Sequence, residues 1–223
     1  QLALADGVAL ASKIRDEKKA TLVFTGDGGA SEGDFHEALN VASVWDLPVI
    51  FAIENNCWGL STPSAEQFRC KQFIDKGIGY GMEAIQINGN NILEVINAVR
   101  SISSNMRKDP KPVLLELMTF RMRGHEEASG TKYYPEGLQD DWQAFDPLTC
   151  YQEFLKSEGV LTDEIESGFI TEIKKEIQDG LDLAFAEPEI EASTELELKD
   201  LFSEYEQVIT EATGNKAEKR FID

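Results

Sequence analysis

Two polar turns carry the side chains of this sequence that are best suited to binding a ligand. The first is Gly26-Asp27-Gly28-Gly29 and the second is Asn55-Asn56-Cys57-Trp58-Gly59. Asp27 offers a carboxylate, and Asn55 or Asn56 offers an amide oxygen; these hard donors suit magnesium or calcium. Gly28 and Gly29 allow the backbone a close approach and lead into a predicted helix, whose N-terminus favours phosphate. Together the turns predict a metal ion that links the protein to a diphosphate.

The elements around these turns are predicted to place them side by side. A strand over 21–25, a helix over 31–45 and a strand over 48–53 form a right-handed crossover with parallel strands. Ser31 and Asp34 form a Ser-x-x-Asp pattern, which predicts a capped helix start at Ser31. Both turns then follow the carboxyl ends of adjacent strands, where open α/β sheets bind their ligands. Each turn alone is also compatible with an ordinary loop, because both sequences are common in turns.

The alternation of strands and helices continues along the chain. Further strands are expected over 83–88 and 112–120, and a helix with a regular apolar stripe over 92–106. The glycines of Gly77-x-Gly79-x-Gly81 are too dispersed for a dinucleotide fingerprint, and we expect them to form a flexible connection. This order of elements predicts an α/β fold with a doubly wound, mostly parallel sheet.

A third polar segment, Arg121-Met122-Arg123-Gly124-His125, follows the strand expected over 112–120 and so reaches the same edge of the sheet. The next stretch, 126–145, lacks strong periodicity, and a loop of that length in a compact domain is usually functional or mobile. By itself, His125 is equally compatible with an ordinary surface histidine. The other histidine, His36, is expected to be a partly exposed polar residue near the site.

In this order, the motifs resemble those of the alpha subunit of the thiamine-diphosphate-dependent first component of 2-oxo acid dehydrogenase complexes. The resemblance rests on Gly-Asp-Gly-Gly-Ala-Ser-Glu-Gly-Asp at 26–34 and Asn-Asn-Cys-Trp-Gly-Leu-Ser-Thr-Pro-Ser-Ala-Glu-Gln-Phe at 55–68, and it covers residues 1 to about 185. It implies the thiamine-diphosphate-binding fold, completed by C-terminal helices.

The resemblance also implies how the cofactors are held. Magnesium would be bound by the Asp27 carboxylate, the Asn56 side chain and the Trp58 carbonyl. The diphosphate would lie against the backbone of Gly28 and Gly29. In this arrangement Asn55 supports the turn and is not a ligand.

The third segment would supply the catalytic residue. The resemblance implies that His125 contacts the diphosphate side of the cofactor and acts on reaction intermediates, while Arg121 orders its loop. In animal relatives the residue after this histidine is a serine whose phosphorylation switches activity. Here that residue is Glu126, so regulation by phosphorylation at this position is not expected.

The implied activity is oxidative decarboxylation of a 2-oxo acid, in which thiamine diphosphate supplies the bond-breaking chemistry and the acyl group passes to a lipoyl domain. The segment 61–68 resembles the branched-chain, 2-oxoisovalerate enzymes, whereas Glu54 is typical of the pyruvate type. We favour a branched-chain acid over pyruvate or acetoin. The expected partners are a beta subunit or fused beta part, which supplies the glutamate that activates the cofactor, and a lipoyl-bearing acyltransferase component. A dimer or alpha2-beta2 assembly is expected, and this chain alone should be inactive.

Composition excludes other classes of protein. The net charge of −20 argues against nucleic acid, and no apolar run approaches the roughly 20 residues of a membrane helix. The three cysteines, Cys57, Cys70 and Cys150, lack the spacing of a zinc site and predict reduced thiols in a cytoplasmic protein.

Three parts of the chain are expected. Residues 1–146 form a diphosphate-binding domain, truncated at its N-terminus, because the chain begins with Gln1 inside a helical pattern. Residues 147–186 form helices that pack on this domain through an apolar stripe at every fourth position. Residues 187–223 form an acidic arm or linker toward a following domain, which suggests fused alpha and beta parts.

Two alternatives belong to other functional classes. The first is a nucleotide-binding or phosphatase-like α/β domain that uses Asp27 to bind magnesium. The second is a non-catalytic assembly module with the acidic arm as its contact surface. Neither alternative explains why His125 reaches the same edge of the sheet as the two turns.

Overall fold

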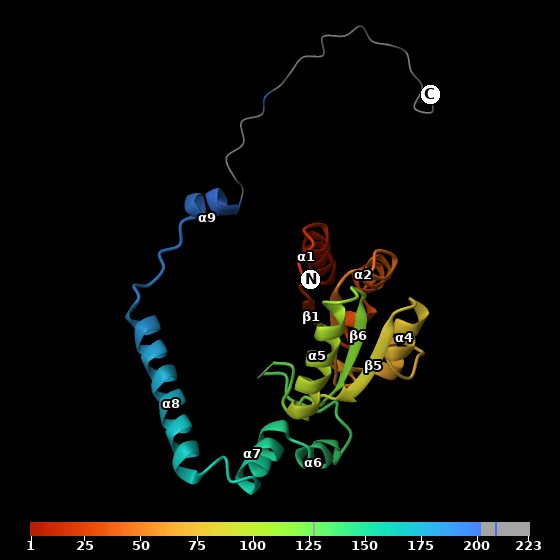
Figure 1. Cartoon of the computed structure of the whole chain (residues 1–223). Helices are drawn as coiled ribbons and strands as arrows, with labels where there is room; N and C mark the ends of the chain where they lie inside the picture. Colours follow the sequence, from red (N-terminus) through yellow and green to blue (C-terminus); the bar gives the residue numbers. More distant parts are fainter. Residues whose placement is uncertain (127, 202–207, 209–223) are drawn as a thin grey trace, which may run out of the picture. The chain divides into compact units, whose positions relative to one another are not determined.

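The computed structural model describes residues 1–126, 128–201 and 208 (Figure 1). It divides into two compact units, Gln1–Thr162 and Asp163–Asp223. The first unit contains all the strands of the described chain and every predicted site residue. Within the described residues, no helix is both long enough and apolar enough to cross a membrane.

A four-stranded parallel sheet forms the centre of the first unit, as predicted. The strand order is β1-β2-β6-β5, and every neighbouring pair is parallel. The two central strands are buried along almost their whole length because helices cover both of their faces. The strands are β1 (Thr21–Gly26), β2 (Val49–Asn55), β5 (Glu83–Asn88) and β6 (Val113–Met118).

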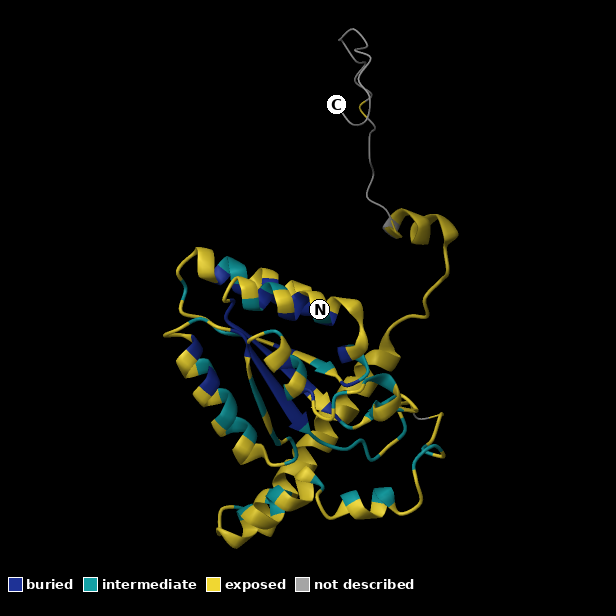
Figure 2. Ribbon diagram, turned by 90° about the vertical axis from the view of Figure 1, so that its right-hand side faces the viewer, coloured by how far each residue is buried: buried dark blue, intermediate teal, exposed yellow. Residues whose placement is uncertain are grey.

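Alternate side chains of the strands enter two separate hydrophobic clusters. In β2, Val49, Phe51 and Ile53 join the cluster that contains residues of α1 (Leu2–Ile14) and α2 (Gly33–Val44). Ile50 and Ala52 join the cluster on the opposite face, which contains residues of α5 (Ile92–Met106). Figure 2 shows the buried strands between helices that are buried on their inner sides. This two-sided burial explains why the strand sequences are apolar throughout.

The strand register aligns the carboxyl ends of the sheet. Gly26 pairs with Glu54, and Asn55 and Asn88 both pair with Met118. The loops that follow β1, β2 and β6 therefore begin at one edge, as the sequence predicts.

The predicted capping box at Ser31 is wrong. A 3-10 turn, η1 (Gly29–Ser31), follows the glycines, and α2 begins only at Gly33, after Glu32 as N-cap without a capping side chain. The Ser31 hydroxyl instead donates a hydrogen bond to Gln67 Oε1 at 3.3 Å. The turn between β1 and α2 is thus held by a neighbouring loop and not by a local cap.

The predicted flexible connection at Gly77–Gly81 is also wrong. Gly77 and Gly79 lie in a helix, α4 (Ile74–Gly79), that packs on the sheet. A Cβ atom on Gly77 would stand 2.8 Å from the Cβ of Ala84 and 3.2 Å from that of Leu114. Gly77 is therefore needed for close contact between helix and sheet, a role that depends on packing across the fold.

The segment after the second turn contains two short strands and a single turn of helix. It forms a small antiparallel hairpin of β3 (Trp58–Gly59) and β4 (Thr62–Pro63), followed by the single-turn α3 (Ser64–Gln67). A short helix, α6 (Leu138–Gln143), interrupts the stretch expected to be a loop, and α7 (Pro147–Ser157) ends the first unit.

The second unit contains α8 (Asp163–Ala186) and α9 (Thr194–Leu201). The predicted apolar stripe of α8 is present, and its members are exposed within the described structure: Ile165, Phe169, Ile173, Ile177 and Leu181. The packing of 147–186 on the sheet domain stays a prediction. Residues 202–207 and 209–223 of the expected acidic arm lie outside the described residues.

Candidate functional site

Asp27 is buried at the end of β1, with 1% of its surface exposed. Its Oδ2 accepts a hydrogen bond from the Ser64 hydroxyl at 3.0 Å, and the Ser64 backbone N–H donates to the Cys57 carbonyl at 2.9 Å. Ser64 thus connects the carboxylate directly to the asparagine turn. The two turns lie next to each other in space although about 30 residues separate them in the chain.

Gly28 allows this approach of the two turns, and Gly29 packs closely on its own strand. A Cβ atom on Gly28 would stand 3.2 Å from the Cα of Gly59, and one on Gly29 would stand 2.4 Å from the Thr25 hydroxyl oxygen. Gly28 has ordinary helical backbone angles, so the requirement is for space and not for a left-handed conformation. Both glycines thus have a packing role within the protein, and their predicted contact with a diphosphate stays a prediction.

The asparagine turn consists of two consecutive side-chain-to-backbone hydrogen bonds. Asn55 Oδ1 accepts from the Cys57 N–H and Asn56 Oδ1 accepts from the Trp58 N–H, both at 2.9 Å. Asn55 is buried and its amide nitrogen also donates to Glu116 Oε1 at 2.7 Å, whereas Asn56 is only partly buried. The Asn55 side chain is therefore fixed inside the protein, and Asn56 is the less buried of the two asparagines.

Arg121 joins the third segment to the hairpin. Its Nη2 atom donates to the Leu60 carbonyl at 2.9 Å and to the Tyr133 hydroxyl at 3.0 Å, while Nη1 lies 3.2 Å from His125 Nδ1. The Tyr134 hydroxyl donates to the Arg121 carbonyl at 3.0 Å. The structure therefore places His125 near the hairpin that begins at Trp58, with Arg121 between them.

The contact with Arg121 defines which nitrogen of His125 is free. A guanidinium group only donates hydrogen bonds, so Nδ1 must accept, and a neutral ring carries its proton on Nε2. His125 is exposed, which leaves this Nε2–H accessible to a ligand. The other histidine, His36, is partly exposed and forms a 2.7 Å hydrogen bond with the Tyr80 hydroxyl; burial first, and then the charge of Lys76, lower its pKa.

The donor set at the first two turns fits a magnesium ion. Burial raises the pKa of Asp27, and the hydrogen bond from Ser64 opposes that shift. Within the described residues no lysine or arginine forms an ion pair with this carboxylate, so a cation would stabilise its charged form. No cluster of three or more acidic, histidine or cysteine side chains is present in the same residues. Magnesium typically uses one or two carboxylates and completes its shell with phosphates, which this arrangement allows.

Comparison with known proteins agrees with this geometry. The family model described as "Dehydrogenase E1 component" matches residues 1–193, most of the chain. The chain belongs to the dehydrogenase E1 component family. The predicted resemblance to its alpha subunit is thereby confirmed, and thiamine diphosphate is the cofactor of this family in general.

The relatives of this E1 chain include both expected substrate types. It is 37% identical over 194 residues to 2-oxoisovalerate dehydrogenase subunit alpha of Bacillus subtilis, covering 85% of this chain and 59% of the relative. This chain is 35% identical over 184 residues to the pyruvate dehydrogenase E1 component subunit alpha of the same organism. The match covers 82% of this chain and 50% of the relative. A mitochondrial 2-oxoisovalerate dehydrogenase subunit alpha 2 of Arabidopsis thaliana is 34% identical to this chain over 206 residues. The match covers 92% of this chain and 42% of the relative. The chain spans about half the length of these relatives.

Two residues that hold the turns in place were not singled out from the sequence. Ser64 lies within a segment used for the resemblance, but its bond to Asp27 depends on the fold of the hairpin. Glu116 is an acidic residue in the otherwise apolar strand β6. An acidic residue among buried apolar neighbours indicates a polar interaction inside the protein, and this signal is visible in the sequence. Both residues connect the turns to the rest of the protein.

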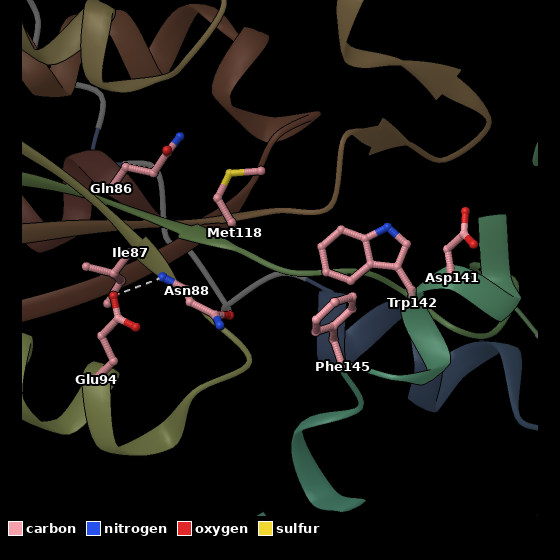
Figure 3. Close-up of a pocket in the computed structure, with 8 residues that line it drawn as sticks. All are labelled: Gln86, Ile87, Asn88, Glu94, Met118, Asp141, Trp142 and Phe145. Carbon is pink, nitrogen blue, oxygen red and sulfur yellow. Dashed lines mark hydrogen bonds between the residues drawn. The ribbon is translucent and has the colours of Figure 1, made fainter. Parts of the chain in front are cut away.

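A pocket of about 440 Å³ lies at the carboxyl ends of β5 and β6 (Figure 3). The Trp142 and Phe145 rings form one wall, and Gln86, Asn88 and Met118 come from the strands on the other side. None of the predicted site residues lines this pocket. The chemistry of the turns is therefore located outside it.

Proposed function

We propose that this chain forms the magnesium and diphosphate side of the thiamine-diphosphate site in a 2-oxo acid dehydrogenase. The observation that carries the proposal is the buried Asp27 carboxylate, joined through Ser64 to the asparagine turn at the carboxyl edge of a parallel sheet. A phosphate-bound magnesium ion would offset the cost of burying this carboxylate, which has no ion-pair partner among the described residues.

In this proposal Asp27, the Asn56 side chain and the Trp58 carbonyl hold magnesium. Gly28 and Gly29 bring the backbone close to the diphosphate, which adds phosphate oxygens to the metal. Thiamine diphosphate supplies the decarboxylation chemistry when it is bound. The contribution of this chain is to hold and orient that group.

His125 is the proposed catalytic residue. Its Nδ1 is occupied by Arg121, so the exposed Nε2–H is the atom that can donate to, or after loss of its proton accept from, a reacting group. Arg121 orients the ring and connects it to the hairpin that carries Trp58. The two halves of the site are thus linked by the Arg121 guanidinium group and by ring contacts of Trp58 with Tyr133 and Tyr134.

A branched-chain 2-oxo acid such as 2-oxoisovalerate is the favoured substrate, with pyruvate or acetoin as the alternative. The segment 61–68 supports the first, and Glu54 supports the second. Relative turnover of 2-oxoisovalerate and pyruvate by the full-length enzyme tests this choice. Higher kcat/KM for pyruvate would contradict it.

The proposed partners are a beta subunit or fused beta part and a lipoyl-bearing acyltransferase that accepts the acyl group. No residue of this chain is assigned as the glutamate that activates the cofactor, so we expect the 223-residue chain alone to be inactive. Measurable decarboxylation of a 2-oxo acid by the isolated chain would contradict this expectation.

Thermal unfolding of the full-length protein with its beta part tests the cofactor assignment. Thiamine diphosphate with Mg²⁺ should raise Tm, because a ligand that binds only the folded state stabilises it. ATP or GTP with Mg²⁺ should not. Stabilisation by a nucleotide alone would favour a nucleotide-binding domain, and no response to any of these ligands would favour an assembly module.

A further inference from the structure

Glu116 is a fully buried acidic residue in the middle of the sheet. It lies in β6 between apolar neighbours and has 0% of its surface exposed. No lysine or arginine forms an ion pair with it among residues 1–126 and 128–201. A charge in such a place is costly unless hydrogen bonds compensate it.

Hydrogen-bond donors surround both oxygens of this carboxylate. Oε1 accepts from Asn55 Nδ2 at 2.7 Å. Oε2 accepts from the Phe73 N–H and from Gln86 Nε2, both at 3.0 Å, and from the Ile74 N–H at 3.4 Å. Every one of these contacts requires an acceptor, which matches a carboxylate. The two oxygens also face different elements: Oε1 faces the asparagine turn, and Oε2 faces the start of α4 and strand β5.

The bond on Oε1 determines the orientation of the Asn55 amide. With its nitrogen directed to Glu116, the amide oxygen of Asn55 must face the Cys57 N–H, from which it accepts at 2.9 Å. Cys57 has a φ of +65°, in the left-handed region that is strained for a residue with a Cβ atom. The Asn55 bond therefore restrains the backbone of Cys57, which lies between Asn56 and Trp58.

We propose that Glu116 is a positioning residue that sets the geometry of the cation-binding turn through Asn55. The inference rests on the proposed function, because the turn is taken to carry the Asn56 and Trp58 oxygens that bind magnesium. Glu116 itself does not touch the ion. It selects the amide orientation of Asn55, and Asn55 holds the backbone that presents the two ligand atoms.

A reciprocal exchange of side chains tests this chain of contacts. In Glu116→Gln, the neighbours of the new amide group are all hydrogen-bond donors. Its nitrogen, which is also a donor, must therefore face either Asn55 Nδ2 or the Phe73 N–H and Gln86 Nε2. In Asn55→Asp, two carboxylates face each other. In the double variant Asn55→Asp/Glu116→Gln, the nitrogen of the introduced glutamine donates to the introduced aspartate, and the glutamine oxygen accepts from Phe73 and Gln86. Every donor again meets an acceptor, and the net charge equals that of the original chain.

Gln86→Met is the matched control. It removes a hydrogen bond from the same carboxylate, but on Oε2, which does not face the asparagine turn. Oε2 keeps its bonds to the Phe73 and Ile74 backbone. This variant should therefore lower the free energy of unfolding without disturbing the hydrogen bonds that link Glu116 to Asn55 and Asn55 to Cys57.

The measurement is the Mg²⁺ concentration that half-saturates thiamine diphosphate binding, determined by calorimetry on the full-length protein with its beta part. Glu116→Gln and Asn55→Asp should each raise it by about 10- to 100-fold, as loss of partners that orient metal ligands does elsewhere. The double variant should return to within about threefold of the original protein, and Gln86→Met should stay in that range. Equal shifts in Glu116→Gln and Gln86→Met, or a double variant no better than the single ones, would overturn the inference.

Amide hydrogen exchange separates this inference from the proposed function. Exchange of the peptide that contains Cys57 and Trp58 should accelerate in Glu116→Gln and not in Gln86→Met, whether or not cofactor is present. Failure of the original protein to bind thiamine diphosphate would refute the proposed function, and unchanged exchange in Glu116→Gln would refute the positioning role. If Glu116→Gln does not fold, Glu116→Asp takes its place, because it keeps both acceptor oxygens but withdraws them from Asn55.

Discussion

The two regions that carry the proposed chemistry are constructed differently. The turns after β1 and β2 are held by buried groups: Asp27, Asn55 and Glu116 each form hydrogen bonds within the fold. His125 is exposed, and the side chain of Arg121 connects it to the hairpin. Metal binding should therefore depend on the sheet edge, and turnover should depend on a segment that can be altered without loss of the metal site.

Asp27→Asn should have the largest effect. Loss of a direct charged ligand should weaken Mg²⁺-dependent thiamine diphosphate binding beyond the about 10- to 100-fold expected for indirect partners. Thermal stability without cofactor should be unchanged or higher, because a buried charge is removed. Calorimetry and thermal unfolding of the full-length protein measure the two effects. The control is Asp34→Asn, at an exposed position of α2, and cofactor binding by Asp27→Asn equal to that of the original protein would contradict the account.

His125→Asn should show most clearly that turnover and metal binding depend on different regions. Removal of a general acid or base should lower kcat by about 10²- to 10⁴-fold. The dissociation constant of thiamine diphosphate with Mg²⁺ should rise far less than in Asp27→Asn, because His125 is expected to contact the diphosphate side of the cofactor but is not a metal ligand. Steady-state kinetics and calorimetry test both statements. His36→Asn, which alters the other histidine, should leave kcat within a few-fold; a comparable loss in both variants would argue against a specific role for His125.

Arg121→Lys should have an intermediate effect. A lysine keeps the charge but cannot reach Leu60, Tyr133 and His125 with one planar group. We expect kcat to fall by about tenfold and limited proteolysis of residues 122–134 to become faster. Arg123→Lys, at an exposed position of the same segment, is the control. Equal proteolysis of the two variants would show that Arg121 does not hold this segment.

Asp6→Asn should leave both metal binding and turnover unchanged and should affect only the free energy of unfolding. Burial raises the pKa of Asp6 to about 6, so the folded protein retains a proton that the unfolded chain has already lost. Stability from this group is therefore present below about pH 4 and is lost as pH rises through about 6. At pH 7 the variant should be more stable by up to about 3 kcal/mol, and at pH 3.5 the difference should vanish.

Urea unfolding at both pH values measures this difference, with Glu37→Gln on the exposed face of α2 as control. A variant that is no more stable at pH 7 would show that the Asp6 carboxylate is not destabilised by its surroundings.

The sheet and its ligand edge could be predicted from the sequence because apolar runs and polar turns are local signals. The parallel strands over 21–26 and 49–55 and the convergence of their turns followed from that pattern. The hairpin after Trp58 and the helix that contains Gly77 did not, because each is determined by partners distant in the sequence. The hydrogen bonds of Ser64 and Glu116 were missed for the same reason: their partners lie 37 and 61 positions away.

The most direct test of the account is the position of a bound metal ion. A crystal structure of the full-length protein with thiamine diphosphate and Mn²⁺, which can be located by anomalous scattering, would show it. We predict an ion coordinated at about 2.1 Å by the Asp27 carboxylate, the Asn56 side-chain oxygen, the Trp58 carbonyl and oxygens of the diphosphate. An ion bound elsewhere, or a diphosphate held without Asp27 and Asn56, would contradict the account.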